Sequence, residues 1–125
     1  MRTGRQLAFL WGGAALVCAV AAPFAPALAR GLPPCPFHAL LGIPCLTCGS
    51  TRALLALARF DFGAAFSWNP LAAAAGILFA AGGLAALGAA LAGRGVEAPR
   101  PTPALRAALA LAICANWIFL VATGR

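Results

Sequence analysis

Long apolar stretches alternate with polar, proline-rich ones along this chain. Residues 7–29 and 70–92 contain no charged side chain, and residues 104–123 contain only Arg106, near their start. A helix rises about 1.5 Å per residue, so roughly twenty residues cross a hydrocarbon core of about 30 Å. The pattern therefore predicts three transmembrane helices. Asn116, a strongly polar residue inside the third stretch, is expected to form a hydrogen bond with a neighbouring helix.

Local residues indicate where these spans begin and end. Asn69 followed by Pro70 is typical of a helix start, with asparagine as the N-cap and proline at the first helical position. Pro23 and Pro26 are expected to kink or end the first span. A second interpretation of the first span is a secretory signal peptide cleaved after Ala29, because a basic start and an apolar run precede an Ala-x-Ala sequence.

The segment between the first two spans, residues 30–69, is expected to be a structured loop with short helices, because its prolines interrupt any long helix. Within it, residues 51–59 have helical spacing, with Ser50 or Thr51 as the expected N-cap. This stretch is too short to cross a membrane, so the helix is expected to be interfacial or re-entrant. Asp61 is expected to cap a brief further turn.

Composition agrees with a membrane protein. Hydrophobic residues make up 63% of the chain and charged residues 9%, against about 25% charged in a typical soluble domain. A bundle of 125 residues cannot bury that much apolar surface from water, so lipid must be the solvent for most of it. The sequence predicts one all-α integral membrane domain over residues 1–125, with residues 93–103 as a polar connector. Asp61 and Glu97 are the only carboxylate side chains, which argues against an enzyme that uses general acid–base catalysis.

The positive charge fits lipid as the partner. The formal net charge is +7, and the basic residues are arginines scattered at the ends of segments. This distribution is typical of anchors for anionic headgroups, whereas a nucleic-acid site needs a cluster on a soluble surface. We therefore expect contact with the lipid bilayer and no nucleic acid. Arg2 and Arg5 precede the first span and favour a cytoplasmic N-terminus, which makes this a multi-pass cell-membrane protein with an extracytoplasmic cysteine loop.

One stretch in the middle of the chain carries most of the residues that can do chemistry. It contains Cys35, Cys45 and Cys48 out of five cysteines, and the single histidine, His38. Two cysteines in C-x-x-C spacing followed by Gly49 can grip one tetrahedral metal ion, and Cys35 supplies a third sulfur. A zinc site needs four ligands, so His38 is the candidate for the fourth.

Several states of these cysteines are compatible with the pattern: a structural disulfide, a metal site, a thiol–disulfide relay or free buried thiols. The leading hypothesis is a structural or interaction module in which the cysteines form a disulfide or hold a metal, with a membrane-protein partner or a second copy. The alternative is a membrane thiol–disulfide oxidoreductase. In every case Cys35, Cys45 and Cys48 are expected to converge beside the start of the 51–59 helix, with Gly49 in the left-handed conformation.

The combined motif resembles a known family. The chain reads C-P-F-x-x-L-x-G-I-P-C-x-x-C-G-x-T-R-A and then Asn69-Pro70. This is similar to the signature of the bacterial domain-of-unknown-function family 2752 over about residues 30 to 90, and it implies a small membrane protein without implying an activity. The residues that match are Cys35, Pro36, Gly42, Cys45, Cys48, Gly49, Thr51, Arg52, Ala53, Asn69 and Pro70. Leu46 departs from the pattern where proline is usual, and so does Phe60 where glycine is common.

Overall fold

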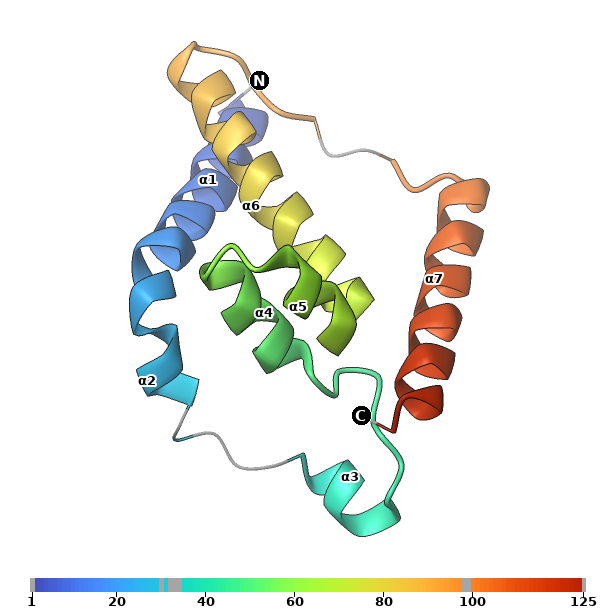
Figure 1. The fold of residues 1–125 in the computed structure, drawn as a ribbon. Coiled ribbons are helices and arrows are strands. Elements are labelled where there is room, and N and C mark those ends of the chain that lie inside the picture. The colour runs from blue at the N-terminus through green and yellow to red at the C-terminus, as the bar shows by residue number, and fades with distance from the viewer. Residues whose placement is uncertain (1, 30, 32–34, 98–99, 125) are drawn as a thin grey trace.

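The computed structural model describes residues 2–29, 31, 35–97 and 100–124, and this part of the chain contains helices and connecting segments but no strand (Figure 1). In chain order the elements are α1 (Arg2–Ala21), the short 3-10 helix η1 (Ala22–Phe24), α2 (Ala25–Ala29), α3 (Pro36–Leu41), α4 (Ser50–Ala58), α5 (Phe62–Trp68), α6 (Pro70–Leu91) and α7 (Pro103–Ala122). Three stretches are long and apolar enough to cross a membrane: Gly4–Ala27, Pro70–Leu91 and Pro103–Ala122. The predicted all-α membrane fold with three spans is confirmed.

Helix ends follow the local signals in the sequence. The side chain of Asn69 accepts a hydrogen bond from Ala72 N at 3.0 Å, so asparagine caps α6 as predicted. The first span changes from α1 to η1 at Ala22, next to Pro23, and the predicted interruption is confirmed. Arg30, which follows the expected cleavage site, lies outside the described residues.

α1 and α6 run antiparallel and pack closely through small residues (Figure 1). Three alanines, Ala8, Ala86 and Ala90, form a buried cluster between them. Gly83 lies so close to α1 that a Cβ placed there would come 2.5 Å from the Cβ of Ala15. Trp11 Nε1 donates a hydrogen bond to Phe79 O at 3.1 Å, which ties α1 to the middle of α6. Contact between these helices therefore depends on positions with little or no side chain.

α4 and α5 form a short helical hairpin beside the N-terminal half of α6 (Figure 1). Leu54 and Leu57 of α4 lie against Gly76, about two turns into α6. Asp61 Oδ1 accepts a hydrogen bond from Ala64 N at 2.9 Å and caps α5, as predicted. The short helix expected over residues 51–59 is therefore α4, and it packs on a spanning helix.

The expected N-cap of α4 is wrong. Gly49 occupies that position, and it has no side chain to accept a hydrogen bond. Ser50 and Thr51 are instead the first two residues of the helix. The hydroxyl of Ser50 accepts a hydrogen bond from Asn69 Nδ2 at 3.3 Å, so it serves the contact with the start of α6.

α7 stands apart from α1 and α6 over most of its length and reaches the rest of the chain near its C-terminal end (Figure 1). The side chains of residues 103–115 are exposed, whereas Asn116 and Leu120 are buried. Asn116 Oδ1 accepts a hydrogen bond from Leu71 N at 3.0 Å, which confirms the predicted bond between spans. An open groove of about 320 Å³, lined mostly by apolar side chains of α6 and α7, lies beside this contact.

Candidate metal centre

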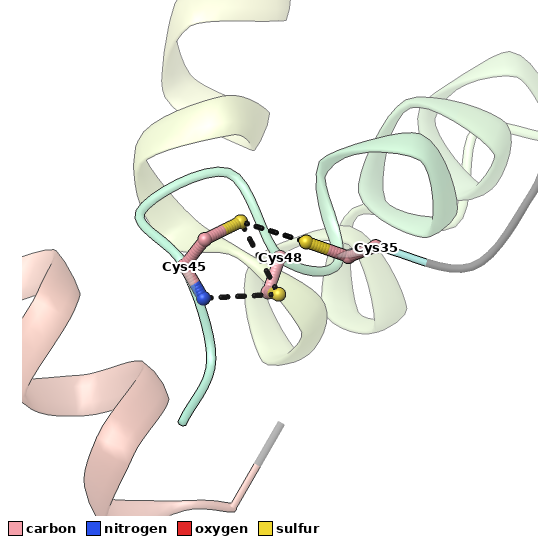
Figure 2. Close-up of side chains that lie close together, drawn as sticks. All are labelled: Cys35, Cys45 and Cys48. Carbon is pink, nitrogen blue, oxygen red and sulfur yellow. Dashed lines mark hydrogen bonds between the residues drawn. The ribbon is translucent and has the colours of Figure 1, made fainter. Parts of the chain in front are cut away.

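Three cysteines from separate positions on the loop lie close together (Figure 2). Cys35 is the N-cap of α3, Cys45 lies in the segment after α3, and Cys48 precedes α4. Their sulfur atoms all lie within 4.8 Å of one another, and Cys45 Sγ is 3.4 Å from each of the other two. The predicted convergence of the three sulfurs is confirmed.

A tight turn brings Cys45 and Cys48 together. Cys48 N donates to Cys45 O at 3.0 Å, and Cys45 N donates to Cys48 Sγ at 3.1 Å. Gly49 then reverses the chain with φ at +78°, the left-handed conformation predicted for it. A Cβ at Gly49 would come 2.9 Å from Trp68 O, so glycine is required here for space as well as for conformation.

The thiols of this turn differ in their surroundings. Cys48 is buried, and burial raises the pKa of its thiol to about 11, with the hydrogen bond to Cys45 acting in the same direction. The hydroxyl of Thr47 lies 3.3 Å from Cys45 Sγ, and this hydrogen bond is the largest of the effects that lower the pKa of Cys45 to about 7. Cys45 therefore carries a substantial thiolate fraction at neutral pH, the form that binds metals and attacks disulfides.

His38 lies beside the sulfurs. It is on α3, three residues after Cys35 and therefore on the same side of the helical turn. Its Nδ1 atom is 3.9 Å from Cys48 Sγ, and its side chain is partly buried. The other two cysteines do not join this group: Cys18 in α1 and Cys114 in α7 are exposed on spanning helices.

Asn69 connects the cysteine turn to the start of α6. Its Nδ2 donates to Cys48 O at 3.0 Å and also contacts Ser50 Oγ, while its Oδ1 caps α6. The side chain is almost fully buried, with 1% of its surface exposed. The Asn69-Pro70 pair predicts the cap, but no local feature of the sequence indicates that the amide nitrogen bonds to the C-x-x-C turn.

α7 also reaches the cysteine loop. Trp117 Nε1 donates to Pro44 O at 3.2 Å, and Asn116 Nδ2 donates to Leu46 O at 3.5 Å. The polar character of Asn116 predicts an interhelical hydrogen bond, but neither contact with the loop was predicted. The one feature of the sequence that could have indicated these contacts is the adjacent polar and aromatic pair, Asn116 and Trp117, near the end of the span.

The remaining motif residues shape the site without joining the sulfurs. Pro36 is the first residue of α3, and Gly42 ends that helix with φ at +67°. The Arg52 guanidinium stacks over the Trp68 ring, with Cζ 4.6 Å from the ring centroid, a cation–π contact that ties α4 to α5. Thr51 is exposed in the first turn of α4.

Comparison with known proteins gives one match. Residues 35–83 match the family described as "Protein of unknown function (DUF2752)". The chain is similar to this family over that segment. The resemblance inferred from the cysteine motif is thereby confirmed, and the matched segment runs from Cys35 to Gly83 within α6. No curated protein and no solved structure matches this chain significantly. The DUF2752 match therefore includes all three cysteines of the site but leaves out α7.

Proposed function

We propose that this protein is a multi-pass membrane protein in which Cys35, Cys45 and Cys48 together hold one metal ion as a structural centre. The observation that carries this proposal is the grouping of the three sulfur atoms within 4.8 Å of one another. Thiolate ligands select zinc and other soft metals over magnesium or calcium. Zinc is the metal we propose, because it has no redox chemistry and suits a structural role.

The distances support a tetrahedral site. Zinc–sulfur bonds of about 2.3 Å in a tetrahedron place neighbouring sulfurs about 3.8 Å apart. Cys45 Sγ lies 3.4 Å from the sulfurs of Cys35 and Cys48, and all three sulfurs lie within 4.8 Å of one another, a range that includes this spacing. A disulfide, by contrast, brings one pair to about 2.0 Å and leaves the third cysteine unpaired.

His38 is the proposed fourth ligand. Its Nδ1 is already 3.9 Å from Cys48 Sγ, close to the spacing of neighbouring ligands in a tetrahedral zinc site. Because His38 and Cys35 share one turn of α3, an ion bound to both would fix this helix against the C-x-x-C turn.

Such a centre would serve a structural or interaction role. It would join α3 and the loop to the starts of α4 and α6, at the end of the bundle opposite the N-terminus of α1 (Figure 1). We infer that this end is extracytoplasmic, since Arg2 and Arg5 lie at the N-terminal end of α1, around the start of the first span, and favour a cytoplasmic N-terminus. A rigid loop held at the membrane surface suits contact with a membrane-protein partner or a second copy of the chain.

A thiol–disulfide oxidoreductase is the second candidate. The pKa of Cys45 is lowered to about 7 and that of Cys48 is raised to about 11. This difference resembles a redox C-x-x-C pair, in which the first thiol attacks as a thiolate and the buried second thiol completes the exchange. The oxidoreductase function requires an external disulfide or oxidant and uses only the C-x-x-C pair. The metal proposal uses all three cysteines of the cluster.

The experiment that separates these proposals is a combined metal and thiol count. The full-length protein is purified in detergent without chelators, and its metal content is measured by inductively coupled plasma mass spectrometry. We expect about one zinc per chain in the wild type, clear loss of zinc in Cys45→Ser, and retention in the matched control Cys114→Ser. A metal-free protein whose free-thiol count falls two short of its cysteine count would contradict the metal proposal and support a disulfide.

A further inference from the structure

α7 contacts the cysteine loop on both sides of one proposed ligand. Trp117 Nε1 donates to the carbonyl of Pro44, the residue before Cys45, and Asn116 Nδ2 donates to the carbonyl of Leu46, the residue after it. Pro44 is buried. Two adjacent residues of a spanning helix therefore fix the backbone that carries Cys45, from about 70 residues further along the chain.

We propose that Asn116 and Trp117 are positioning residues for the three-sulfur centre, so that docking of α7 and metal binding strengthen each other. This inference rests on the proposed metal function. Groups that hold a ligand in place from outside the coordination shell are worth about 10- to 100-fold in metal affinity. Here the held groups are backbone carbonyls, and their position sets the direction in which Cys45 Sγ points.

The effect of metal binding is expected to be measurable in α7 because this helix has few other attachments. Side chains of residues 103–115 are exposed, and the buried residues of this helix are Asn116 and Leu120. Asn116 also accepts from Leu71 N at 3.0 Å, so the same side chain joins the start of α6 and the cysteine loop. If docked α7 raises the affinity for metal, bound metal must favour docked α7 by the same factor.

The first test measures zinc affinity of the full-length protein in detergent, by competition with a chromogenic chelator. Trp117→Phe keeps the aromatic ring but removes the N–H that reaches Pro44 O. We expect affinity to fall about tenfold or more. Trp11→Phe is the matched control, since Trp11 also donates to a backbone carbonyl, that of Phe79, within the α1–α6 contact. Its zinc affinity is expected to equal that of the wild type.

The second test reads the coupling from α7. Hydrogen exchange is followed by mass spectrometry in zinc-loaded protein and after chelation. Zinc is expected to slow exchange in residues 116–122, and Trp117→Phe is expected to reduce that protection. Exchange in the segment around Phe79 is the internal reference, because it lies in the α1–α6 contact.

The outcomes separate the two proposals. Equal zinc affinities for Trp117→Phe and Trp11→Phe, or α7 exchange that ignores zinc, would overturn the positioning role while leaving the metal centre in place. A wild-type protein that binds no zinc would overturn the metal centre, and this inference with it. If Trp117→Phe also lowers the unfolding midpoint of the zinc-free protein, its lower zinc affinity no longer separates a positioning role from a loss of stability. Asn116→Asp is then the deciding variant. It keeps the oxygen that accepts from Leu71 N but removes the donor to Leu46 O, and unchanged affinity there would also overturn the role.

Discussion

The side-chain amide of Asn69 donates a hydrogen bond to the backbone carbonyl of Cys48 at 3.0 Å, and its oxygen caps the spanning helix α6. One buried side chain therefore sets both the start of a transmembrane helix and the position of a C-x-x-C turn. The cysteine cluster and the bundle are parts of one structure, and changes at their junction are expected to affect both.

Replacement of Asn69 tests this junction. Asn69→Ala removes an N-cap, worth about 1 kcal/mol, and leaves the Cys48 carbonyl without its partner, which adds about 1–3 kcal/mol. The control is Thr102→Ala at α7, where Thr102 Oγ1 accepts from Leu105 N at an exposed position and the cap alone is lost. Unfolding midpoints in detergent are compared. Equal losses of stability in the two variants would show that the contact with Cys48 contributes nothing.

Gly49 provides a second test of the turn. Gly49→Ala places a non-glycine residue at φ +78° and a Cβ at 2.9 Å from Trp68 O. The conformation alone costs about 1–2 kcal/mol, and the clash adds to it. Gly42→Ala is the matched control, because Gly42 also has a positive φ, +67°, but open space where the Cβ would be. The thermal midpoint is expected to fall further for Gly49→Ala, and the reverse order would contradict the close contact with Trp68.

Packing between α1 and α6 is tested at Gly83. A Cβ there would come 2.5 Å from the Cβ of Ala15, so Gly83→Ala is expected to destabilise the protein by about 1–3 kcal/mol through overpacking. Gly88→Ala, in the same helix with nothing within 4 Å of its Cβ, is expected to be neutral or to stabilise by about 0.5–1 kcal/mol. Detergent unfolding curves provide the measurement. A harmless Gly83→Ala would mean that α1 is not packed at this point.

Cys45 is expected to react as a thiolate near neutral pH once metal has been removed. Its pKa is lowered to about 7, chiefly by the Thr47 hydrogen bond, so its alkylation rate should rise as pH increases through about 7 and then level off. Below that pH the thiol is protonated and the rate falls. Thr47→Val removes the bond and should move the midpoint up toward the ordinary cysteine value.

The reaction is followed with iodoacetamide and peptide mass spectrometry on reduced, chelator-treated protein. Thr51→Val is the control, because Thr51 is exposed and lies beyond the turn. An alkylation midpoint that stays unchanged in Thr47→Val would assign the low pKa of Cys45 to another cause.

Orientation in the membrane is tested by labelling with an impermeant thiol reagent. In a variant with Cys18→Ala and Cys114→Ala, the loop cysteines are expected to react in reduced, intact spheroplasts, because the arginines at the N-terminal end of α1 favour a cytoplasmic N-terminus. The control combines replacement of all five cysteines with Glu97→Cys in the α6–α7 connector, at the opposite end of the bundle. That variant should react only after lysis, and the inverse result would place the cysteine loop in the cytoplasm.

Helix positions and the caps of α5 and α6 could be predicted because their causes are local. Asn69-Pro70 and Asp61 carry their capping chemistry within three residues of the donor that they satisfy. The convergence of Cys35 with the C-x-x-C pair was also within reach, since a short proline- and glycine-containing loop closes at low entropic cost.

The contacts that hold the site could not be predicted in the same way. Trp117 and Pro44 are separated by 73 positions, and nothing near either residue indicates the other. The close contact of Gly83 with α1 could not be predicted either, because α6 is apolar on every side and offers small residues on several faces. The Thr47 hydroxyl can form a hydrogen bond with Cys45 Sγ only because the turn brings it close to the sulfur, and the residue types alone do not indicate this.

The α4–α5 hairpin gives the bundle unequal ends. It lies beside the N-terminal half of α6, where Leu54 and Leu57 meet Gly76, while the other half of α6 packs on α1. With α6 spanning a bilayer, we expect the protein to displace more lipid from the leaflet nearest the cysteines than from the opposite one. A wedge of this kind fits best where the leaflet around its wide end is stretched. We therefore expect membrane curvature to act on the end of the bundle that contains the three sulfurs.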